Sequence, residues 1–135
     1  MNPRLVFSGD WRLATGGWYY RRVQEAATTV FARGAMVLVT LHSPREKFWG
    51  VILELTPVGL GVRGVDLNCL DDFARLVREG EAASAGAVFF PLHRVERIEL
   101  DVPGGGFPSL GERFAAQSGR QPAAVLETAS PVERG

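Results

Sequence analysis

The feature that most constrains this chain is the alternation of apolar and polar residues between Ala35 and Leu100. Apolar residues at every second position are typical of a β-strand that buries one face. Three such segments follow one another through short turns, and two shorter segments then flank a tight corner. Short strands in close succession are typical of sandwiches and barrels. The sequence therefore predicts a mainly β fold with flanking helices, in which a small, five-stranded, strongly bent sheet forms a barrel.

Turn residues separate the predicted strands. Ser43–Glu46 and Pro57–Gly59 are expected to form the first two turns, and Pro91–Arg94 the corner. A glycine inside the second strand, Gly50, indicates a sharp bend or a close backbone approach. The predicted strands cover residues 35–42, 47–55, 58–65, 87–90 and 97–102. Their apolar positions place four side chains mostly in the core: Trp49, Leu53, Val62 and Ile98.

Helical periodicity appears before, within and after this β region. Residues 18–33 carry apolar side chains at helical spacing and end at Gly34, which predicts an N-terminal helix. Residues 67–86 have the character of an insert, in which Asn68 is expected to cap a short helix that ends at Gly80.

The predicted organisation has four regions: an N-terminal extension (1–17), the barrel domain with its N-terminal helix and inserted helix (18–102), a linker with C-terminal helices (103–128), and a flexible tail (129–135). Ser109 and Glu112 have the spacing of a capping box at a helix start. Pro122 suits the first turn of a further short helix.

The composition excludes several classes of function. The 135 residues include 15 basic and 15 acidic side chains, so no overall positive charge attracts nucleic acid. The single cysteine, Cys69, excludes an internal disulfide and a cysteine-based zinc site within one chain. No segment approaches the ~20 apolar residues that span a bilayer, and the first residues lack the apolar core of a secretory signal. We therefore expect a cytoplasmic protein without a membrane partner.

No group of residues points to an enzyme. The segment Gly59–Gly64 matches the G-x-G-x-x-G pattern of dinucleotide sites, but a β pattern follows it, so we interpret it as a turn and a strand. His42 and His93 lack the spacing of metal ligands. A nucleophile with its base and orienting group is also missing. We expect no catalytic residue, no cofactor and no metal.

Aromatic and basic residues cluster before the barrel. Residues 18–22 read Trp-Tyr-Tyr-Arg-Arg, and residues 1–34 contain five arginines and two carboxylates, a local charge of +3. Tyr20, Arg21 and Arg22 have the chemistry to stack on bases and neutralise phosphates. The same side chains are equally suited to anchoring a helix on the barrel, because arginine stems cover apolar surface. Both interpretations stay open.

The order of helix, three bent strands, insert and two short strands joined by a corner resembles the Sm-like fold of Sm, LSm and Hfq-type proteins. The resemblance covers residues 18–101. The first motif of that family has a glycine in the second strand, an apolar residue two positions on, and an aspartate further along. Gly50 and Ile52 match this motif, and Thr56 stands at the aspartate position.

The second motif of the family is a short strand, a polar corner and an alternating strand, which residues 89–98 resemble. His93 falls at the histidine of the tyrosine-lysine-histidine signature of Hfq-type proteins. Pro91 and Leu92 replace the other two signature residues.

The resemblance implies a non-enzymatic protein that forms homo-oligomers and binds RNA. Family members pair the fourth strand of one subunit with the fifth of the next, which here implicates the edges Ala87–Phe90 and Arg97–Asp101; short apolar edge strands favour such strand addition. The residues expected to contact RNA are Tyr20, Arg21, Arg22, His93 and Arg94. The alternative is a protein–protein scaffold or assembly module of the same fold without RNA binding, which the neutral net charge favours.

Overall fold

A computed structural model describes residues 30–81 and 84–126. The chain divides into two compact units, 1–32 and 33–135, and every strand of the sheet belongs to the second unit. The predicted extension (1–17), most of the predicted helix (18–33) and the predicted tail (129–135) lie outside the described residues.

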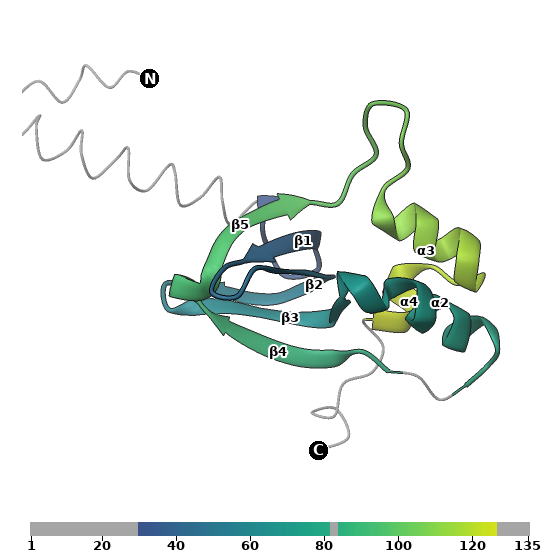
Figure 1. The fold of residues 1–135 in the computed structure, drawn as a ribbon, viewed down its shortest axis with the longest axis horizontal. Coiled ribbons are helices and arrows are strands. Elements are labelled where there is room, and N and C mark those ends of the chain that lie inside the picture. Colours follow the sequence, from purple (N-terminus) through teal and green to yellow (C-terminus); the bar gives the residue numbers. More distant parts are fainter. Residues whose placement is uncertain (1–29, 82–83, 127–135) are drawn as a thin grey trace, which may run out of the picture. The chain divides into compact units, whose positions relative to one another are not determined.

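Five antiparallel strands form one sheet in the order β4-β3-β2-β1-β5 (Figure 1). Alternation and turn residues predicted all five. Their bounds are β1 Met36–Leu41, β2 Glu46–Thr56, β3 Gly59–Asp66, β4 Gly86–Pro91 and β5 Val95–Leu100. The Gly59–Gly64 segment lies inside β3, as a turn-and-strand interpretation predicts and a dinucleotide loop does not.

The sheet is open rather than a closed barrel. Among the described residues, β4 pairs only with β3 and β5 pairs only with β1, so these two strands form the edges. The short 3-10 turn η3, Leu92–Arg94, joins them at a corner. In Figure 1, β4 runs toward this corner and β5 runs back from it on the far side of the sheet. The predicted five-stranded, mainly β sheet is therefore confirmed, but no hydrogen bonds between β4 and β5 close it into a barrel, because β5 pairs with β1.

Close contact between β2 and β3 explains two of the glycines. A Cβ on Gly64 would lie 2.0 Å from the carbonyl oxygen of Trp49. A Cβ on Gly50 would lie 2.4 Å from the carbonyl oxygen of Arg63. The close backbone approach predicted from Gly50 is confirmed, and it has a matching glycine on the neighbouring strand.

The two faces of the sheet carry separate sets of apolar side chains, because neighbouring residues in a strand point to opposite faces. One face carries six fully buried side chains: Val37, Val39, Leu41, Ile52, Leu60 and Val62. The opposite face carries Trp49 and Val51. Trp49 and Val62 are completely buried, as predicted, whereas Leu53 and Ile98 are half-buried. Leu53 lies at a register shift between Ile52 and Glu54, which breaks the alternation that predicted its burial.

Three helices cover the face that carries Trp49: α2 (Leu70–Arg78), α3 (Leu110–Ser118) and α4 (Pro122–Leu126). In Figure 1 they gather together beside the sheet. Phe114 of α3 is the centre of this layer, with its ring centroid 5.5 Å from that of Trp49 and 5.6 Å from that of Phe73. The chain therefore completes this part of its core by itself.

Of the two predicted helix caps, one is confirmed and the other is wrong. Ser109 and Glu112 form the predicted capping box, and Gly119 ends α3 with a positive φ of 80°. Asn68 is not the cap of α2. The carboxylate of Asp66 accepts a hydrogen bond from the Asn68 amide and caps a 3-10 turn, η2 (Leu67–Cys69), which leads directly into α2.

Candidate interface

The free edge of β4 is apolar. Its residues Gly86 to Phe90 include no charged side chain. Val88 is 37% exposed and Phe89 is 48% exposed, whereas Phe90 packs edge-on against Phe48 with ring centroids 5.3 Å apart. Phe89 and Phe90 point to opposite faces of the strand, because successive side chains alternate. Phe90 is thereby partly buried, and Phe89 remains without full cover.

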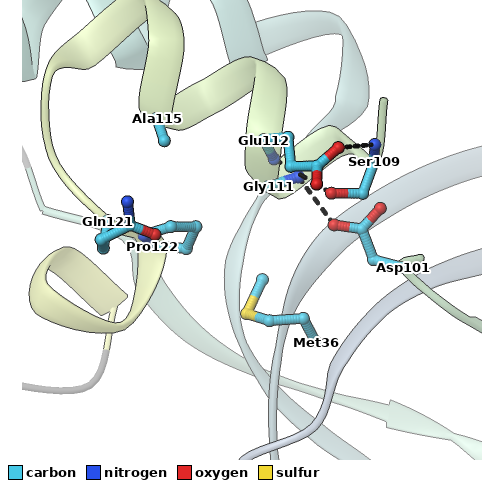
Figure 2. Close-up of a pocket in the computed structure, with 8 residues that line it drawn as sticks. All are labelled: Met36, Asp101, Ser109, Gly111, Glu112, Ala115, Gln121 and Pro122. Carbon is cyan, nitrogen blue, oxygen red and sulfur yellow. Dashed lines mark hydrogen bonds between the residues drawn. The ribbon is translucent and has the colours of Figure 1, made fainter. Parts of the chain in front are cut away.

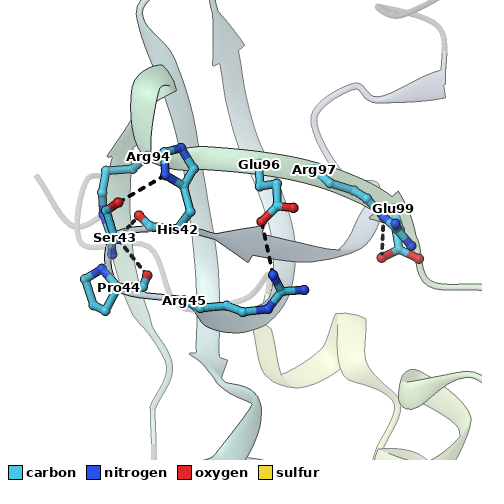
Figure 3. A network of polar contacts seen from close by, with 8 residues as sticks. All are labelled: His42, Ser43, Pro44, Arg45, Arg94, Glu96, Arg97 and Glu99. Atoms are coloured by element: carbon cyan, nitrogen blue, oxygen red, sulfur yellow. Dashed lines mark hydrogen bonds and ion pairs between the residues drawn. The ribbon is translucent and has the colours of Figure 1, made fainter.

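The free edge of β5 combines apolar and charged residues. Leu100 is 36% exposed and Ile98 is half-buried. On the opposite face, the guanidinium of Arg97 and the carboxylate of Glu99 form an ion pair at 3.0 Å (Figure 3). The hydrogen bond and the negative charge of Glu99 raise the pKa of Arg97 above its ordinary value. These paired charges leave no net charge on this part of the edge.

Arg94 of η3 holds the turn between β1 and β2 (Figure 3). Its Nη1 donates to the carbonyl oxygens of His42 and Pro44, the latter at 2.9 Å. Its Nη2 donates to Oε1 of Glu46 at 3.2 Å. The planar guanidinium therefore satisfies three acceptors at once, which a lysine ammonium cannot reproduce in that geometry. The structure places this predicted RNA contact within an intramolecular clamp.

Of the other four predicted RNA contacts, only His93 lies within the described residues. His93 precedes Arg94 in η3 and is exposed. Tyr20, Arg21 and Arg22 lie outside the described residues. The structure thus brings His93 and Arg94 together at one corner of the sheet, next to the end of β4.

Several other charged side chains on the described surface form ion pairs. Arg45 lies 3.6 Å from Glu96, as Figure 3 shows. Further ion pairs join Arg75 to Asp72 and to Glu79, and Arg113 to Asp71. Opposite charges that neutralise each other offer little net attraction to a polyanion. These ion pairs reduce the net charge that Arg45, Arg75 and Arg113 present to a nucleic acid.

Asp101 is a polar group whose long-range contacts the sequence did not predict. Its Oδ2 accepts hydrogen bonds from Trp49 Nε1 at 3.0 Å and from the Gly111 amide at 2.7 Å. Its Oδ1 accepts from the Leu110 amide at 2.7 Å. A carboxylate at a helix N-terminus satisfies amides that have no partner within the helix. Asp101 thereby ties the end of β5 to both α3 and the centre of the sheet.

A cavity of about 320 Å³ lies beside Asp101 (Figure 2). Its lining residues are Met36, Asp101, Ser109, Gly111, Glu112, Ala115, Gln121 and Pro122. Both carboxylates are committed to the start of α3, because Glu112 Oε1 accepts from the Ser109 amide at 3.0 Å. The cavity is therefore part of the joint between sheet and helices, and it holds no nucleophile paired with a base.

No family model, no curated protein and no solved structure matches this chain. Within residues 30–81 and 84–126, no group of three His, Cys, Asp or Glu side chains is placed to hold a metal ion. No helix in the same residues is both long enough and apolar enough to cross a bilayer.

Proposed function

We propose that this protein is a non-enzymatic, Sm-like assembly module that forms homo-oligomers by pairing β4 of one copy with β5 of the next. Two features support the Sm-like identity. The strands follow the order β4-β3-β2-β1-β5, and a three-residue turn joins β4 to β5 at a sharp corner. This arrangement agrees with the order of elements on which the sequence resemblance rests.

The observation that carries the proposal is the unprotected edge of β4. Folded proteins normally protect such an edge with charges, proline, a bulge or a covering segment. Here the edge lacks charge from Gly86 to Phe90 and exposes Val88 and Phe89. Its only proline is Pro91, at the end that meets the corner. A strand added at this edge would satisfy its backbone groups and cover Phe89.

β5 has the properties of the strand that would be added. Both strands contain six residues, so their edges match in length. They run in opposite directions on the two sides of the sheet (Figure 1). A neighbour added in the same orientation therefore brings its β4 antiparallel to β5, which is the geometry of strands in the rest of the sheet.

Molar mass in solution tests this proposal. We expect the full chain at tens of micromolar to have a mass that is a multiple of 14.7 kDa. Phe89→Lys places a charge at the β4 edge and should reduce the mass to that of the monomer, because edge lysines block strand addition. Val58→Lys is the matched control, since Val58 is 70% exposed but lies in the turn between β2 and β3. A wild-type protein that is monomeric under these conditions would overturn the proposal.

RNA binding is the second candidate function, and the exposure of His93 beside the β4 edge favours it. In this proposal Tyr20, Arg21 and Arg22 stack on bases and contact phosphates, with His93 as a further contact. Binding of mixed RNA oligonucleotides should then weaken steeply with salt, and Arg21→Ala with Arg22→Ala should flatten that dependence. If no binding is detected at low salt, the assembly module without RNA remains the better description.

A further inference from the structure

The segment between β5 and α3 is a shaped arm rather than a simple linker. The amide of Gly104 donates to the carbonyl oxygen of Phe107 at 3.1 Å, and the Phe107 amide donates back to Gly104 at 2.9 Å. Gly105 and Gly106 connect them with φ values of 57° and 82°. Two consecutive residues with positive φ are typical of a tight two-residue hairpin turn, a conformation that glycine adopts readily. We call residues 102–108 the arm.

The arm exposes apolar side chains that nothing in the described chain covers. Phe107 is 75% exposed and Val102 is 64% exposed, the first and third most exposed of the large apolar side chains described. The arm also lacks any charged residue. An aromatic side chain held at such exposure on an uncharged segment is typical of a contact with another molecule.

Both ends of the arm are fixed to the domain. At its start, the Asp101 amide donates to the Met36 carbonyl oxygen at 2.9 Å, so β5 is held against β1 to its last residue. At its end, the Asp101 carboxylate binds the first turn of α3, as Figure 2 shows. In Figure 1 the loop extends away from the sheet and the helices, beyond the free edge of β5. The position of the arm is therefore set by Asp101 at both ends.

We propose that the arm clasps the neighbouring copy of this chain in the oligomer. Antiparallel pairing brings the end of β5, at Leu100, beside Gly86 at the start of the neighbour's β4. The arm continues directly from that end of β5. Its apolar side chains then lie over the start of the neighbour's β4. This inference rests on the proposed pairing of β4 with β5, and it identifies the arm as a second contact between the same two copies.

Sedimentation velocity on a dilution series of the full chain tests this inference. Val102→Ser combined with Phe107→Ser should raise the dissociation constant of the oligomer by about tenfold or more. At a concentration where both proteins are monomeric, the melting temperature of this variant should equal that of the wild type, since both side chains are exposed. Val58→Ser, which removes an exposed valine from the opposite end of the sheet, should leave both quantities unchanged.

The outcomes separate the arm from the strand pairing. If the arm variant assembles with the wild-type dissociation constant while Phe89→Lys dissociates, the clasp is wrong and the strand pairing stands. If the wild-type chain is monomeric, both are wrong. A photoreactive phenylalanine analogue at position 107 gives an independent test. It should cross-link to residues 86–88 of a second copy, and cross-links confined to other segments or to other proteins would overturn the clasp.

Discussion

The helix-covered face of the sheet and the free edge of β4 both carry aromatic and aliphatic side chains, but these side chains are covered to different extents. On the covered face, Trp49 packs on Phe114 and both are fully buried within one chain. At the β4 edge, Phe89 is 48% exposed and no strand pairs on its outer side among the described residues. The comparison shows that this chain satisfies one apolar surface internally. The other stays partly exposed among the described residues.

The largest expected effect concerns the centre of the covered face. Phe114→Ala should reduce the free energy of unfolding by about 4 kcal/mol, because it leaves a cavity between Trp49 and Phe73. Phe107→Ala is the matched control and should change the stability of the monomer by about 0.5 kcal/mol or less, as exposed positions usually do. Urea denaturation monitored by circular dichroism measures both. If the free energy of unfolding falls equally in the two variants, the distinction between covered and free surfaces is wrong.

The next effect concerns the joint between the sheet and α3. Asp101→Ala removes the acceptor of three hydrogen bonds and should cost about 3 kcal/mol, since buried donors would be left without partners. Asp72→Ala removes a carboxylate from an exposed ion pair and should cost about 0.5 kcal/mol. The same denaturation series measures both variants. If Asp101→Ala lowers the free energy of unfolding by no more than Asp72→Ala does, this description of Asp101 is wrong.

A smaller effect is expected where β2 and β3 approach closely. Gly64→Ala should destabilise the protein by about 2 kcal/mol, because the new methyl group would overlap the Trp49 carbonyl and force a backbone shift. Gly86→Ala is the matched control at the free edge, where an added Cβ meets nothing within 4 Å. The melting temperature of Gly64→Ala should therefore be clearly lower than that of Gly86→Ala. Similar melting temperatures would contradict the close approach of the two strands.

The smallest effect concerns the corner between the two edges. Arg94→Lys keeps the positive charge but loses the simultaneous hydrogen bonds to His42, Pro44 and Glu46, and should cost about 1 kcal/mol. Arg75→Lys, in exposed ion pairs on α2, should be nearly neutral. If Arg94→Lys leaves stability intact while abolishing RNA binding, Arg94 serves a nucleic acid rather than the turn.

The strands were predictable because each carries its own alternation and its own turn residues. The capping box at Ser109 was predictable for the same reason, since the two residues that form it are three positions apart. The incomplete burial of Leu53 was not predictable, because this residue lies at a register shift that interrupts the alternation of the strand.

Long-range partners explain the remaining differences. In the local sequence, Asp101 is simply the last polar residue of an alternating strand. Only the fold brings Trp49 and the start of α3 within hydrogen-bonding distance of its carboxylate. Arg94 reads locally as part of a basic corner, yet its acceptors lie about fifty residues earlier. Whether an edge strand stays free also depends on the path of the corner, which the composition of β4 does not encode. For these reasons the sequence predicted the elements better than the site.

The most direct test of the assembly account is the molar mass of the full chain at tens of micromolar, measured by light scattering alongside Phe89→Lys and Val58→Lys. The account predicts a multiple of 14.7 kDa for the wild type and for Val58→Lys, and 14.7 kDa for Phe89→Lys with unchanged circular dichroism. A monomeric wild type, or an oligomer that Phe89→Lys leaves intact, would contradict it.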